Sequence, residues 1–210
     1  MEKKRILKHI CLNKYFLLFL LIIILTGNFN AFFPYFSLLV IHEMGHALVG
    51  IILGYKLDKI TFYPYGGITT FNLPLNIPLK EELMILLAGP IMQIIGYFIL
   101  NPFYDIKLYH YTLLIFNLLP IYPLDGGRIL KSILCLIKGR KRAESLINKI
   151  SNSMFFLIMF VFSILIYYLK NISILTIMLY LLYIVTKENK IYKMKIRMYE
   201  EIENNRQEKI

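Results

Sequence analysis

The segment from His42 to His46 has the residue types and the spacing of a catalytic metal site. Its sequence is His-Glu-Met-Gly-His. Residues four apart lie on one face of a helix, so both imidazoles can bind one metal ion, and zinc accepts such nitrogen ligands. Glu43 follows the first ligand, where its carboxylate can take a proton from a zinc-bound water as that water attacks a carbonyl group. This is the H-E-x-x-H arrangement of zinc metalloproteases.

The residues around this segment strengthen the metal interpretation. The segment lies in an apolar run from Phe36 to Gly50. Three ionisable side chains in such a run are costly unless a metal ion, water or a partner compensates them. The alternative is a buried polar cluster that holds helices together. A cluster of that kind would not need the four-residue spacing, so we favour a metal site.

Asp125 is the candidate for a third ligand, because a catalytic zinc commonly has three protein ligands and a water. Neither His9 nor His110 is expected at a suitable depth in the membrane. Asp125 is surrounded by residues that break helices: Pro120, Pro123, Gly126 and Gly127. We expect them to unwind the helix, and irregular backbone at membrane depth is tolerated only against protein or a wet cavity. The alternative is an ion pair between Asp125 and Arg128 at the cytoplasmic interface.

Asn117 and the segment 61–71 are candidates for substrate binding. The Asn117 amide could bond a substrate backbone or help to stabilise an oxyanion; the alternative is a hydrogen bond between helices. Segment 61–71 is aromatic and β-branched and is broken by Gly66 and Gly67, which suits a short hairpin. The edge of such a hairpin could pair with an extended peptide. An ordinary interfacial loop is an equally good interpretation.

The elements that must position these residues are membrane helices. The chain of 210 residues is 58% hydrophobic and only 18% charged, and its apolar residues form long runs, as in polytopic membrane proteins. The runs are 15–25, 31–53, 83–100, 109–137, 154–169 and 172–186. We therefore predict an all-α membrane protein of about six transmembrane helices, with a hairpin-like surface loop near 61–71. A basic head (1–14) precedes the membrane domain (15–186), and a charged tail (187–210) follows it.

The basic residues predict the orientation. With both termini in the cytoplasm, all but Lys107 and Lys170 of the 24 Lys and Arg residues lie in cytoplasmic segments or at cytoplasmic span ends. The net charge of +11 could suggest a nucleic-acid partner. Because the positive charge sits at the ends of apolar runs, we expect the lipid bilayer as the partner and no direct binding of nucleic acid. Cys11 and Cys135 form neither a CxxC pattern nor a disulfide framework.

With its two motifs in this order, the chain resembles the site-2 protease family of intramembrane zinc proteases. His42 to His46 matches that family's HExxH segment in a transmembrane helix. The stretch from Asn117 to Gly126 matches its second motif, and Ala88-Gly89-Pro90 matches a feature between the two. The resemblance implies one zinc ion per chain bound by His42, His46 and Asp125, with Glu43 as the catalytic base and Asn117 in substrate handling.

Within the family, the six-span plan and the early HExxH segment are similar to the sporulation branch. Those proteases release a sigma-factor precursor from its membrane-associated pro-sequence, so a pro-sigma factor is the implied substrate and membrane inhibitor proteins are implied partners. Members often carry a cystathionine-β-synthase-type regulatory domain after the last span. The tail 187–210 is too short for one, so control by nucleotide through such a domain is not expected. No PDZ insertion is visible, which argues against the envelope-stress branch.

Two other functions compete with proteolysis. A non-catalytic membrane zinc protein could bind clients or scaffold a complex, but it would have no need of Glu43. A zinc transporter could use His and Asp as transit ligands, but it would want polar residues across several spans, and the other runs lack them. An endopeptidase acting near the cytoplasmic face of the membrane is the function that we expect.

Overall fold

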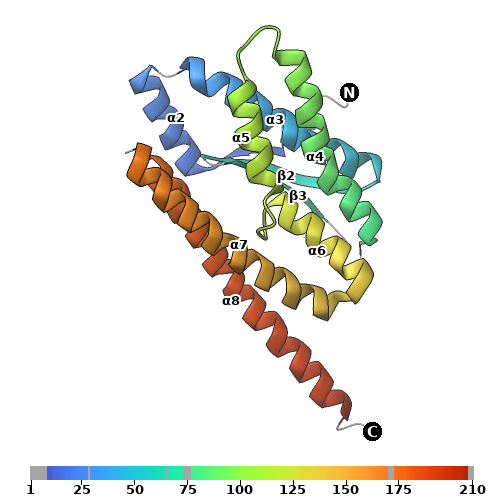
Figure 1. Ribbon diagram of the computed structural model, residues 1–210. Coiled ribbons are helices and arrows are strands. Elements are labelled where there is room, and N and C mark those ends of the chain that lie inside the picture. Colours follow the sequence, from blue (N-terminus) through green and yellow to red (C-terminus); the bar gives the residue numbers. More distant parts are fainter. Residues whose placement is uncertain (1–8, 28, 65, 73–76, 170–172, 208–210) are drawn as a thin grey trace. The chain divides into compact units, whose positions relative to one another are not determined.

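The computed structural model describes residues 9–27, 29–64, 66–72, 77–169 and 173–207 (Figure 1). These residues are mostly helical, with one small sheet of three strands. The chain divides into two compact units, Met1–Asn117 and Leu118–Ile210. The expected mostly helical fold is therefore confirmed, and the sheet contains the expected hairpin.

Helices α2 to α5 belong to the first unit. They are α2 (Lys14–Thr26), α3 (Phe29–Ile52), α4 (Leu79–Leu100) and α5 (Lys107–Leu118). Helices α3 and α4 pack at very short range because a glycine of each helix faces a larger side chain of the other. A Cβ atom built on Gly45 of α3 would lie 2.8 Å from Cβ of Met92 in α4, and one built on Gly96 of α4 would lie 2.9 Å from Ile41. Glycine at these positions lets the two helix backbones approach, as is common between membrane helices.

The sheet of the first unit confirms the predicted hairpin and extends it. Strand β2 (Lys56–Tyr63) pairs antiparallel with β3 (Gly66–Asn72), in a register that places Thr61 opposite Ile68. Strand β1 (Ile10–Leu12) pairs parallel with β2, so the order is β1-β2-β3 and β3 lies at an edge. The prediction missed β1, because three residues inside a basic head carry no recognisable strand pattern.

Aromatic side chains hold the sheet against the helices of this unit. The ring of Phe36 in α3 lies 5.5 Å from that of Phe16 in α2 and 5.3 Å from that of Phe62 in β2, measured between centroids. Phe16 and Phe62 are both almost fully buried. Because large aromatic side chains contribute strongly to core packing, this cluster fixes α3 relative to β2.

The second unit contains α6 (Asp125–Lys138), α7 (Arg140–Leu169) and α8 (Ser173–Gln207). The structure adds three details to the expected elements. The apolar run 109–137 is two short helices, α5 and α6, separated at residues 119–124. The basic stretch after residue 137 is helical, and only Gly139, with a left-handed φ of 77°, separates α6 from α7. Residues 187–207 of the predicted tail continue α8.

Three helices in the described part of the chain are long and apolar enough to cross a membrane: Phe32–Ile52, Leu79–Leu100 and Arg140–Tyr168. The shorter apolar helix Lys14–Thr26 has 13 residues, which spans about 20 Å at about 1.5 Å per residue. The hydrocarbon core is about 30 Å thick. The structure therefore bears out membrane helices, and a full set of six spans stays a prediction.

Candidate metal centre

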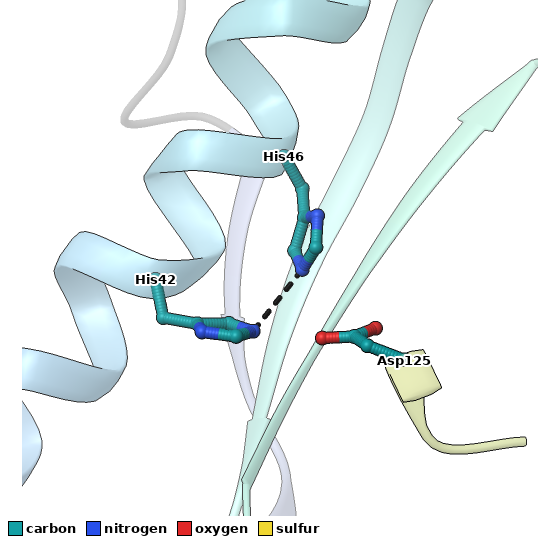
Figure 2. A group of neighbouring side chains, drawn as sticks. All are labelled: His42, His46 and Asp125. Carbon is teal, nitrogen blue, oxygen red and sulfur yellow. Dashed lines mark hydrogen bonds between the residues drawn. The ribbon is translucent and has the colours of Figure 1, made fainter. Parts of the chain in front are cut away.

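His42 and His46 lie one turn apart on α3, as the spacing predicts. Their side chains are almost fully buried, with 1% and 6% of their surface exposed. The two Nε2 atoms lie 3.1 Å apart, along the dashed line in Figure 2. Two nitrogen ligands at about 2.0–2.1 Å from one tetrahedral zinc are about 3.3 Å apart. The observed separation therefore fits two imidazoles that share one ion.

The other ring nitrogens have acceptor partners. Nδ1 of His42 lies 3.0 Å from Oε1 of Gln93, and Nδ1 of His46 lies 2.7 Å from the carbonyl oxygen of Ile85. Both partners are oxygens that can only accept, so each Nδ1 must carry a proton and donate it. In the neutral imidazole, each Nε2 then presents a lone pair. This is the arrangement typical of histidines that bind zinc.

Gly89 of α4 provides the space that the imidazoles occupy. A Cβ atom built on this residue would collide with the His46 ring and would lie 2.9 Å from Nε2 of His42. No side chain larger than hydrogen fits there while the two rings stay in place. Gly89, in the Ala88-Gly89-Pro90 stretch, therefore lies against the two histidines.

Glu43 is held by the hairpin. Its side chain is only 5% exposed, and the Thr69 hydroxyl of β3 donates a hydrogen bond of 2.7 Å to its Oε2 atom. Gly67, also in β3, leaves room for the carboxylate, because a Cβ atom built there would lie 2.6 Å from Cδ of Glu43. The hairpin thus fixes the position of the residue expected to act as a base.

Asp125 begins α6, directly after the irregular segment 119–124. The break itself was predicted, but Gly126 and Gly127 lie in the first turn of the helix rather than in the break. A Cβ atom built on Gly126 would lie 2.6 Å from the carbonyl oxygen of Leu119. Glycine is therefore needed because the preceding backbone folds back against the start of α6. The segment is also held from α7, since the backbone N–H of Tyr122 donates to the Ser151 hydroxyl at 3.0 Å.

Together, His42, His46 and Asp125 form a group that could hold a metal ion. Each offers one ligand atom, and these atoms all lie within 4.8 Å of one another. Figure 2 shows the Asp125 carboxylate beside the two imidazole nitrogens. Two imidazoles and one carboxylate are a donor set that zinc commonly has in catalytic sites.

The remaining predicted residues lie at the hairpin and at the end of α5. Gly66 and Gly67 begin β3, but only Gly67 approaches Glu43; a Cβ atom on Gly66 would meet nothing within 4 Å. Asn117 is half-buried in the last turn of α5. Sequence reasoning did not identify Gln93 or Thr69. Both are distant in sequence from their partners, and a single polar residue in an apolar helix or a strand gives no pattern.

Comparison with known proteins agrees with this geometry. The model of peptidase family M50 matches residues 31–104 and 97–162. The chain belongs to this family. It is 32% identical to a zinc metalloprotease of Methanocaldococcus jannaschii over 86% of this chain and 57% of that protein. It is 31% identical to stage IV sporulation protein FB of Bacillus subtilis over 51% of this chain and 41% of that protein.

A solved structure of a site-2 protease also resembles this chain. The site-2 protease from Methanocaldococcus jannaschii superposes with a TM-score of 0.62 and 30% identity, covering 85% of this chain and 89% of that one. The expected resemblance to site-2 proteases and the expectation of zinc are thus confirmed at the level of the family. The chain spans about half the length of the curated relatives it matches.

Proposed function

We propose that this chain is an intramembrane zinc endopeptidase that cuts a membrane-associated protein near the cytoplasmic face. The observation that carries the proposal is the position of Glu43. A buried carboxylate, oriented by Thr69, directly follows the first histidine of the group His42, His46 and Asp125. A scaffold without catalysis would need the ligands but not a carboxylate that the hairpin holds in place one residue after the first histidine.

Each residue has a distinct role in this proposal. His42, His46 and Asp125 hold the zinc ion, which when bound supplies Lewis acidity and activates water at neutral pH. Glu43 accepts the proton of the attacking water and passes it to the leaving amine. The Thr69 hydroxyl donates to one oxygen of Glu43 and orients the carboxylate, whose remaining lone pairs can accept the proton.

The substrate binds as an extended segment beside the hairpin. Strand β3 is an edge of the sheet, and an edge strand offers N–H and C=O groups to an incoming peptide. Gly66 and Gly67 open this strand, and Gly67 is next to Glu43. Because a helix buries its peptide carbonyls in its own hydrogen bonds, the substrate must unwind before it is cut. The Asn117 amide is proposed to bond the substrate backbone.

The identity of the substrate follows only from similarity. The match to stage IV sporulation protein FB covers about half of this chain and supports a role in sporulation, with a sigma-factor precursor as the substrate. Membrane inhibitor proteins would then be partners. In this proposal the chain crosses the membrane six times, with the segment before residue 15 and the segment after residue 186 in the cytoplasm.

A reconstituted cleavage assay tests the function. The purified chain is placed in lipid vesicles with a membrane-tethered sigma-factor precursor, and a second tethered protein without a pro-sequence serves as control. We expect cleavage of the precursor that stops when 1,10-phenanthroline removes zinc and returns when zinc is added. Cleavage that persists in the zinc-free protein would refute the metalloprotease. Cleavage of the control protein but not of the precursor would refute the proposed substrate and would leave the proposed protease activity standing.

A further inference from the structure

A buried glutamine of α4 connects the metal centre to α5. Gln93 is fully buried, with 0% of its surface exposed. Its Oε1 atom lies 3.0 Å from Nδ1 of His42, and its Nε2 atom donates a 3.0 Å hydrogen bond to the backbone carbonyl of His110. A polar side chain buried this deeply in an apolar helix is costly unless both ends of its amide are bonded. Here both ends are bonded.

The His110 carbonyl determines which way the amide points. A carbonyl oxygen only accepts, so the NH₂ group of Gln93 must face it, and Oε1 must then face His42. The reversed amide would place two acceptors against each other at 3.0 Å and would direct an N–H donor at Nδ1 of His42. Stacking of the His110 ring on Tyr97 of α4, with centroids 4.3 Å apart, holds this part of α5 against α4.

The two histidines differ in how they are fixed. The partner of His46 is a backbone carbonyl, which comes with the helix. The partner of His42 Nδ1 is a side chain, so a substitution can remove it. We propose that Gln93 is a positioning residue for the metal centre: it fixes the tautomer and ring plane of His42 so that Nε2 is the ligand atom. This inference rests on the proposed zinc site but not on the cleavage reaction.

Zinc affinity of the intact protein tests the proposal. Gln93→Met keeps the length of the side chain and loses both hydrogen bonds, whereas Gln93→Glu keeps an acceptor for His42. Partners of ligating histidines typically contribute about 10- to 100-fold to metal affinity. We expect that loss in Gln93→Met when zinc is titrated against a chelator, and a smaller loss in Gln93→Glu. Ile95→Ala, at an exposed position of the same helix, should bind zinc as the wild type does.

Two further measurements separate positioning from folding. The metal-free Gln93→Met protein should melt as a folded protein, and its cobalt-loaded form should show a changed visible spectrum, which reports ligand geometry. If Gln93→Met does not fold, Gln93→Asn replaces it, because its shorter amide cannot span from His42 to His110. Zinc affinity within twofold of the wild type in the folded variant would overturn the proposal. Failure of the wild type to bind zinc would instead overturn the proposed function.

Discussion

At the scale of single residues, the candidate metal centre is a set of side chains. Hydrogen bonds fix their orientation, and a glycine leaves the space that they occupy. Gln93 and the Ile85 carbonyl orient the two imidazoles, and Thr69 orients Glu43. Gly89 lets α4 lie against the histidine rings. Preorganisation of this kind matters because small displacements of catalytic groups cost rate.

The Gly89→Ala substitution tests the tight fit. Its methyl group would overlap both imidazole rings, and overpacking of this kind costs about 1–3 kcal/mol. If the overpacking displaces the two imidazoles and its whole cost weakens zinc binding, zinc affinity drops by about 5- to 150-fold. Titration with a chelator measures the affinity. Gly66→Ala is the matched control, because its methyl group would meet nothing within 4 Å; equal zinc affinity of the two variants would contradict the prediction.

The candidate ligands could be proposed from the sequence, but the residues that hydrogen-bond to them could not. His42, Glu43 and His46 sit within five residues, so helical geometry alone places them together. Asp125 was identified from the helix breakers around it and from the resemblance of its segment to a family motif. Gln93 and Thr69 act across 51 and 26 positions of the chain. Such contacts depend on how α3, α4 and β3 pack, and the spacing of neighbouring residues in the sequence does not predict that packing.

At the scale of elements, the hairpin has one structural role and one proposed role in substrate binding. Its strand β3 holds Glu43 through Thr69 and Gly67, and its outer edge is the proposed place for the substrate. The hairpin was predictable from β-branched and aromatic residues around a glycine pair. The division of run 109–137 into α5 and α6 was predictable only as a break, because the two glycines expected to unwind the helix instead allow close backbone packing at its first turn.

Cysteine cross-linking tests strand pairing at β3. Ile68 is 48% exposed, so Ile68→Cys is introduced into a Glu43→Gln chain whose Cys11 and Cys135 are replaced by serine. Single cysteines are then scanned along the tethered substrate. Side chains alternate along an extended strand, so disulfide yield should peak at every second substrate position. Peaks at every third or fourth position would indicate a helical substrate and would contradict pairing with β3.

At the scale of the whole molecule, the charge pattern and the apolar helices predict how the chain lies in the membrane. Three described helices are long enough to cross it, which is fewer than the six expected from hydropathy. Apolar runs show where a chain can enter lipid, but short helices such as α2 and α5 leave the number of crossings undecided. The distribution of Lys and Arg is a stronger argument for the orientation of the chain than the number of apolar helices is.

Labelling with a membrane-impermeant maleimide tests this orientation. In a chain without its native cysteines, Lys107→Cys should react in intact cells, because residue 107 is predicted to face outward. Lys190→Cys should react only after the membrane is permeabilised. Both lysines are exposed, so access through protein does not limit labelling. The opposite pattern would place the basic segments outside and would contradict a site open to the cytoplasm.

The most direct test of the zinc protease compares the wild type with Glu43→Gln at equal zinc content. The substitution keeps the size of the side chain and removes the proton acceptor, so one zinc per chain should remain. Cleavage of the tethered substrate should fall by about 100- to 10,000-fold. Glu82→Gln, in the first turn of α4, should cleave at the wild-type rate. Full activity of zinc-loaded Glu43→Gln would contradict the account.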